Sequence, residues 1–140
     1  MLFRSGHTRR GRDGCRVPMP WSRSGPSLGF GSGEPWLPQP AHWSTLSVEA
    51  QDADHTSMLW LYRDALHTRR ELAELHTGDH AWIDLGEDVL SFTRGDRFAC
   101  VVNFGSGSIE LPSGGVLLAS APLRADGHLP TDAAAWVRLH

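Results

Sequence analysis

Apolar residues recur at helical spacing over one stretch of this chain, from Ser57 to about Leu75. Such spacing places apolar side chains on one helical face and therefore predicts an amphipathic helix. No proline or glycine interrupts the pattern before Gly78, and Asp54 or Thr56 can cap its start. A shorter helical turn is predicted just before it, around residues 45–51. The apolar positions of the longer helix are Met58, Leu59, Leu61, Tyr62, Ala65, Leu66, Leu72, Ala73 and Leu75.

Beyond Gly78 the pattern changes to short β-rich runs separated by glycine, aspartate or proline. Short strands at regular intervals, with turn residues between them, predict an antiparallel sheet or a small sandwich. Gly95-Asp96 stands between two of the runs and is typical of a hairpin turn. The predicted strands are residues 81–85, 89–93, 98–104, 108–111, 116–120 and 134–139.

Residues 1–42 show neither helical nor strand periodicity and are rich in glycine, proline, serine and arginine. This composition predicts an extended loop, because fixing each residue costs roughly 1–2 kcal/mol and little apolar burial offsets that cost. Large apolar residues in such a segment are typical anchors on another surface, and here they are Trp21, Phe30, Trp36, Leu37 and Trp43. The chain is therefore expected to be α+β, with an irregular region at 1–53, one long amphipathic helix at 54–77 and a β-domain at 78–140.

Length and charge narrow the possible functions. The 140 residues allow one ordinary domain, whereas a complete (β/α)8 barrel takes about 250 residues. Residues 1–25 carry six arginines and one aspartate, within a chain whose net charge is −3 and which contains no lysine. A basic arm of this kind attracts nucleic acid. Because this arm lacks interleaved aromatic residues, we expect no nucleic-acid partner.

The chain shows no sign of a membrane or an exported protein. It contains no apolar run of about 18 residues, and its first residues lack the apolar core of a signal peptide. Arg9-Arg10 superficially resembles a twin-arginine export signal, but polar residues follow it. Cys15 and Cys100 are far apart and are expected to stay reduced. We therefore expect a soluble cytoplasmic protein without a membrane partner.

The histidines and glycines form no recognisable metal or nucleotide motif. His76 and His80 are four residues apart, but Gly78 separates them and no third ligand has suitable spacing for zinc. Gly105 and Gly107 follow a strand without leading into a helix, which argues against a phosphate-binding loop. We expect neither a metal nor a cofactor.

Residues 12–21, Arg-Asp-Gly-Cys-Arg-Val-Pro-Met-Pro-Trp, followed by Gly-Glu-Pro-Trp at 33–36, carry a family resemblance. They resemble the Arg-Asp, Arg-Thr/Val-Pro-Met/Leu-Gln/Pro-Trp signature of α-glucosidases and oligo-1,6-glucosidases in glycoside hydrolase family 13. Residues 59–70 resemble the Leu-Tyr-Arg-x-Ala-Leu-x-Leu-Arg-Arg helix of these enzymes. Residues 100–104, 109–112 and 135–139 resemble their C-terminal β-domain. The resemblance covers nearly the whole chain in order, with departures at Gly14-Cys15 and at Pro20, where a glutamine is often found.

The resemblance implies that the chain is the C-terminal portion of such an enzyme. It would comprise the loop after the last barrel strand, the last barrel helix and an accessory β-domain that stabilises the barrel. The family's catalytic carboxylates precede this region, so the chain alone is expected to be inactive. Its partners would be the missing barrel and, in the whole enzyme only, an α-glucoside oligosaccharide. The acids of this chain better fit turns or solvated surface, and they include Glu34, Glu49, Asp52, Asp84, Glu87 and Asp88.

The same resemblance implies that Arg16, Trp21 and Trp36 lie near the barrel mouth, where they would help to form the sugar-binding cleft. The alternative is that the two tryptophans only pack and that Arg16 pairs with Asp13 or another carboxylate.

A second hypothesis makes the chain a small carbohydrate-binding module. Its exposed tryptophans would serve as stacking platforms, with Trp82 and Trp136 as the candidates in the β-region. Under the first hypothesis, the helix without its barrel exposes an apolar stripe, which predicts self-association or a need for a complementary fragment.

Overall fold

The structure, a computed structural model, describes residues 15–140. The chain divides into two compact units, Met1–Leu61 and Tyr62–His140. Short helices are followed by a five-stranded antiparallel sheet, which confirms the predicted α+β class. Residues 1–14, which include most of the basic arm and the first part of the signature, lie outside the described residues.

The first unit is built from turns and short helices. It contains the 3-10 helices η2 (Pro26–Gly29) and η3 (Ala41–Leu46) and the helix α1 (Val48–Asp52), which matches the predicted turn around 45–51. The segment predicted as an extended loop is folded on itself. Trp21 donates its backbone N–H to the carbonyl of Leu28 at 2.8 Å, and Glu49 donates its own to the carbonyl of Trp21 at 3.0 Å. Backbone hydrogen bonds therefore order a segment that has few apolar residues to bury.

Helix α2 (Met58–Glu71) is shorter than predicted and is capped differently. The side-chain oxygen of Gln51 accepts the N–H of Leu59 at 3.1 Å. The Asp54 carboxylate instead accepts the N–H and the hydroxyl of Thr56, so neither predicted residue caps the helix. The helix ends before Leu72 because that residue is buried against Phe98 of the sheet, and the short helix α3 (Glu74–Thr77) follows.

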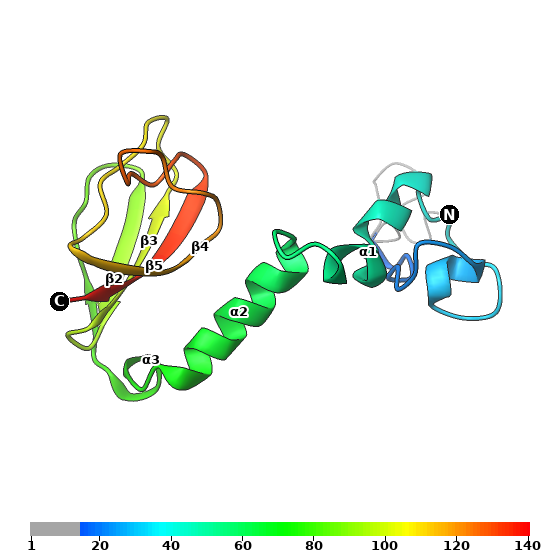
Figure 1. Ribbon diagram of the computed structural model, residues 1–140, viewed down its shortest axis with the longest axis horizontal. Helices are drawn as coiled ribbons and strands as arrows, with labels where there is room; N and C mark the ends of the chain where they lie inside the picture. The colour runs from blue at the N-terminus through cyan, green and yellow to red at the C-terminus, as the bar shows by residue number, and fades with distance from the viewer. Residues whose placement is uncertain (1–14) are drawn as a thin grey trace, which may run out of the picture. The chain divides into compact units, whose positions relative to one another are not determined.

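The sheet has the strand order β1-β2-β3-β5-β4, with every pair antiparallel (Figure 1). The strand β5 closes the chain and yet lies inside the sheet, between β3 and β4. Gly95 adopts a left-handed φ of 57° between β2 and β3, as the predicted hairpin turn requires. The strands are β1 (His80–Trp82), β2 (Val89–Arg94), β3 (Phe98–Asn103), β4 (Gly114–Ala119) and β5 (Ala133–Leu139).

The two faces of the sheet bury different clusters. One face packs Val101 and Ala135 against Leu129 from the loop that precedes β5. The other face packs Phe98 and Cys100 against Leu72. The run predicted as a strand at 108–111 forms only one bridge, between Ile109 and Leu129, because a proline at 112 cannot donate to a ladder.

Asn103 ties the sheet to the loops around it. Its fully buried amide donates to the carbonyls of Gly107 at 2.8 Å, Pro130 at 3.0 Å and Leu129 at 3.3 Å. Its side-chain oxygen accepts the N–H of Gly105 at 2.9 Å. One side chain thus satisfies backbone groups of two loops that are far apart in sequence.

We expect Asn103→Ala to lower the free energy of unfolding by about 3 kcal/mol, because several buried backbone groups lose their partner. Urea denaturation followed by circular dichroism measures the change. Ser106→Ala, at an exposed position of the same loop, is the control and should change stability by less than about 0.5 kcal/mol. Equal stability of the two variants would contradict the role given to Asn103.

The two cysteines should differ in reactivity. Cys15 is exposed and Cys100 is buried, and neither forms a disulfide. Burial raises the pKa of the Cys100 thiol, so less reactive thiolate is present at a given pH. We expect iodoacetamide at pH 8 to label Cys15 rapidly and Cys100 only after unfolding, as peptide mass spectrometry will show. Rapid labelling of Cys100 in the Cys15→Ser variant would contradict this prediction.

Candidate functional site

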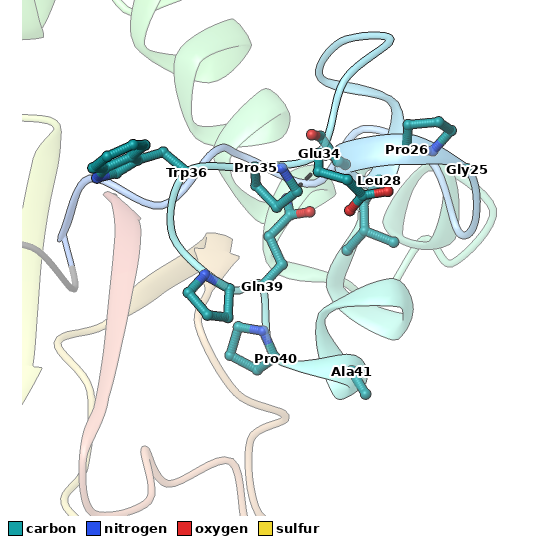
Figure 2. Close-up of a pocket in the computed structure, with 11 residues that line it drawn as sticks. Gly25, Pro26, Leu28, Glu34, Pro35, Trp36, Gln39, Pro40 and Ala41 are labelled. Carbon is teal, nitrogen blue, oxygen red and sulfur yellow. Dashed lines mark hydrogen bonds between the residues drawn. The ribbon is translucent and has the colours of Figure 1, made fainter.

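One candidate site is a pocket of about 580 Å³ in the first unit (Figure 2). The loop that forms it begins at Gly25, whose φ is 90°, and continues through Ser27 and Leu28 in the left-handed region. These turns bend the chain so that residues 34–41 face η2. The lining residues are Gly25, Pro26, Ser27, Leu28, Glu34, Pro35, Trp36, Pro38, Gln39, Pro40 and Ala41.

Gln39 holds this pocket together. Its side-chain amide donates to the carbonyl of Pro18 at 2.9 Å and to the carbonyl of Ser27 at 3.1 Å. The Ser27 hydroxyl in turn donates to the carbonyl of Gly33. The pocket is therefore shaped by polar side chains bonded to the backbone, with prolines limiting the freedom of the loop.

Of the three predicted sugar-binding residues, the structure places only Trp36 in this pocket. Its side chain is 81% exposed, and Figure 2 shows the ring at one end of the loop, apart from Glu34 and Leu28. Trp21 is half exposed and Arg16 is exposed, and neither lines the pocket. Asp13, the suggested partner of Arg16, lies outside the described residues.

The chemistry available in this pocket is limited. Glu34 is the one carboxylate among its lining residues. Retaining glycoside hydrolysis requires two carboxyl groups about 5–5.5 Å apart. The pocket therefore presents a sugar-sized hollow with an aromatic rim, and its own residues do not form a hydrolytic pair.

No motif in the sequence marks Gln39 as the residue that organises the pocket. Its place between Pro38 and Pro40 was the available signal, because two flanking prolines restrict the backbone and fix the direction of the side chain between them. The partners of Gln39, Pro18 and Ser27, are distant in sequence, so the bonds themselves had no local signature.

An aromatic group lies on the sheet of the second unit. The rings of His80 and Phe92 stack with centroids 5.2 Å apart, and Trp82 meets Phe92 edge to face at 5.9 Å. The Trp82 side chain remains 67% exposed. Trp136 packs edge to face on buried Phe98 at 5.6 Å, so it is part of a core cluster and a poorer platform than Trp82.

A second cavity, of about 230 Å³, lies beside this group in the same unit. It is lined by Arg69, Leu75, Phe92, Arg94, Phe98 and Trp136. The two cations come from the last turn of α2 and the last residue of β2. An aromatic cavity with two guanidinium groups can accept an anion.

Neither a metal-binding cluster nor a membrane-spanning helix is present among residues 15–140. Within residues 15–140, no group of three or more His, Cys, Asp or Glu side chains gathers as a metal site. His76 and His80 belong to α3 and β1, so they do not share a helical face. In the same part of the chain, no helix is long and apolar enough to cross a membrane.

Comparison with curated proteins finds relatives among α-glucosidases. A probable α-glucosidase of Rhizobium meliloti is 34% identical over 74% of this chain and 19% of its own length. A glucan 1,6-α-glucosidase of Streptococcus pneumoniae is 30% identical over 72% of this chain and 19% of its own length. The chain thus spans about a fifth of the length of these relatives.

Solved structures give a similar result. The α-glucosyl transfer enzyme XgtA is 34% identical, with a TM-score of 0.71 over 96% of this chain and 28% of that enzyme. The trehalulose synthase MutB of Pseudomonas mesoacidophila is 28% identical, with a TM-score of 0.72 over 91% of this chain and 26% of that enzyme.

The family model that matches is the catalytic domain of α-amylase, and it matches residues 2–78. The matched segment ends just before the first strand of the sheet. Because it covers more than half of the 140 residues, the chain belongs to the α-amylase family.

Proposed function

We propose that this chain is the C-terminal portion of an α-glucosidase of the α-amylase family. In this proposal, residues up to 77 complete the end of the catalytic barrel and residues 78–140 form the accessory β-domain. The catalytic carboxylates belong to the barrel, so the chain alone has no hydrolytic activity. The single carboxylate among the residues that line the larger pocket supports this division of roles.

The observation that carries the proposal is an uncovered apolar stripe on α2. Met58, Tyr62 and Leu66 follow one another four residues apart and are 57%, 64% and 49% exposed. No residue of α2 is buried. An amphipathic helix of a globular protein normally packs its apolar stripe against a core. We infer that the barrel provides the surface that covers this stripe.

The sheet offers a second uncovered surface. Trp82 pairs with Phe92, and Leu90 lies two residues before Phe92, so all three side chains project from the same face. Trp82 and Leu90 are exposed, although both are large and apolar. A contiguous apolar surface of this kind marks an interaction site. In the proposed enzyme it packs against the catalytic portion.

The proposed substrates are α-linked glucosides, acted on by the whole enzyme. The names of the relatives describe enzymes that act on an α-glucosyl group, either as glucosidases or as a glucosyl transfer enzyme. Arg16, Trp21 and Trp36 contribute to sugar binding only when the barrel is present. We assign the enzyme to the cytoplasm, a choice that the two unpaired cysteines support because reduced thiols persist there.

The exposed ring of Trp82 favours a second candidate function, carbohydrate binding by the isolated sheet. Tryptophan rings present a flat apolar face, and the contact with Phe92 holds this ring in place. A module of this kind would bind maltose or longer α-glucans without the barrel.

We expect the purified chain to release no p-nitrophenol from p-nitrophenyl α-glucoside. Mixing it with the Rhizobium meliloti relative, shortened by the segment that this chain matches, should restore hydrolysis. Tyr62→Glu should lower the restored rate at least tenfold, because it places a charge in the apolar contact. Absorbance of released p-nitrophenol gives the rates.

Asp64→Arg is the control for this experiment. Asp64 is exposed and lies two residues from Tyr62, and therefore on the opposite side of α2. Its substitution should leave the restored rate within about twofold of the unchanged chain. Hydrolysis by the chain alone, or equal restoration by Tyr62→Glu, would contradict the proposal.

The second candidate function predicts that maltose quenches the tryptophan fluorescence of the chain saturably and that Trp82→Ala abolishes the effect. Phe104→Ala removes another exposed aromatic ring and should leave binding unchanged. If maltose and longer α-glucans do not bind the unchanged chain, carbohydrate binding by the sheet alone is eliminated.

A further inference from the structure

The cavity between Arg69 and Arg94 serves no role in the function proposed so far. Arg94 is the last residue of β2, where the register pairs it with His80 on one side and Phe98 on the other. Arg69 comes from the last turn of α2. Leu75 of α3 lines the cavity together with the aromatic rings.

The two arginines lack a negatively charged partner. Neither forms an ion pair with a carboxylate of residues 15–140, and none of the six lining residues is acidic. The nearby Glu71 carboxylate instead lies 3.2 Å from His67. The Nε atom of Arg94 is buried without a hydrogen-bond acceptor. Buried polar groups normally have a partner, and an unpartnered one in a native protein calls for a physical explanation.

The size of the cavity limits what can enter it. Pockets for drug-sized ligands hold roughly 300–1,000 Å³, whereas this one holds about 230 Å³. Phe92 and Trp136 provide apolar walls that suit the methylene groups of a side chain, and the guanidinium groups suit its carboxylate. A glutamate or aspartate side chain matches both features.

We propose that this cavity receives an acidic side chain from the catalytic portion that packs on this face of the sheet. The inference rests on the proposed function, because that function supplies the packed surface. The cavity is continuous with the apolar face, since Phe92 lines the cavity and also contacts Trp82, which is exposed. The carboxylate pairs with both guanidinium groups as the apolar face is covered.

The carboxylate and the two guanidinium groups would specify how the catalytic portion docks on the sheet. Exposed apolar surface adheres without much directional preference, whereas a carboxylate between two guanidinium groups has a required position. An arginine left in the docked interface without its carboxylate would be desolvated and unpaired. Misaligned docking is therefore disfavoured, which is how charge pairs commonly set the register of an interface.

The test uses the full chain and two amino acid derivatives, N-acetyl-glutamate amide and N-acetyl-glutamine amide. Their capped backbone groups carry no charge. The two derivatives differ in the carboxylate alone. NMR spectra follow the Nε–H signal of Arg94, which burial protects from exchange, and the indole N–H of Trp136. We expect saturable shifts of both signals with the glutamate analogue and no saturable shift with the glutamine analogue at equal ionic strength.

Substitutions then locate the binding. Arg94→Gln and Arg69→Gln should each lower the affinity for the glutamate analogue at least tenfold, as measured by titration of the Trp136 signal. Either substitution removes one of the two charges. Arg70→Gln removes an adjacent exposed charge of α2 that does not line the cavity, and it should bind as the unchanged chain does. Matching backbone amide spectra establish that each variant is folded.

Three results would overturn the proposal. Equal shifts with both analogues would mean that the aromatic walls bind without the carboxylate. Saturable binding of inorganic phosphate, with none of the glutamate analogue, would make the cavity a site for a free anion. The absence of a shift with every probe would exclude the cavity as a binding site for a carboxylate or another anion. None of these readouts needs the barrel, so they can fail while restored hydrolysis succeeds, and the reverse.

Discussion

Asn103 places a fully buried amide at the end of β3, where four hydrogen bonds join it to the backbone of two loops that are far apart in sequence. The core around it is small, because Val101, Leu129, Ala133 and Ala135 are its only fully buried apolar members among the described residues. A unit of about 80 residues buries little more than 60% of its unfolded surface. The loops that complete this core therefore depend on polar bonds to hold their position, and the positions of β3 and β5 depend on those loops.

The local sequence pattern was sufficient to predict the helices and strands, but it was insufficient to predict where they end. The strand runs at 89–93, 98–104, 116–120 and 134–139 all became strands of the sheet, because each is a short β-rich run bounded by turn residues. The order β3-β5-β4 had no local signal, since it brings β5 past β4 to pair with β3. The predicted helix was too long because the apolar spacing continues through Leu72, whereas that side chain packs on the sheet. Burial of Leu72 in the tertiary structure therefore ends the helix, although the helical spacing of apolar residues continues.

The candidate sites show the same limit more strongly. Trp36 could be named from its aromatic character and its motif, and it does line a pocket. Gln39 could not, because its role lies in bonds to Pro18 and Ser27. Arg69 and Arg94 are 25 residues apart, and nothing in the sequence pairs them. Only the return of the chain after α3 brings them to one cavity, and no pattern within either segment records that return.

The uncovered apolar surfaces and the unpaired arginines are most simply understood together. A carbohydrate-binding sheet needs an exposed ring, which Trp82 provides, but it has no use for an apolar stripe on α2 or for a guanidinium with a buried, unpartnered Nε. A docking surface accounts for all three features. In the proposed docking, apolar contact would supply the free energy of association, and the charged cavity would restrict the geometry in which that contact forms. Because both the stripe and the cavity include residues of α2, a single docking event can cover the helix and the sheet face.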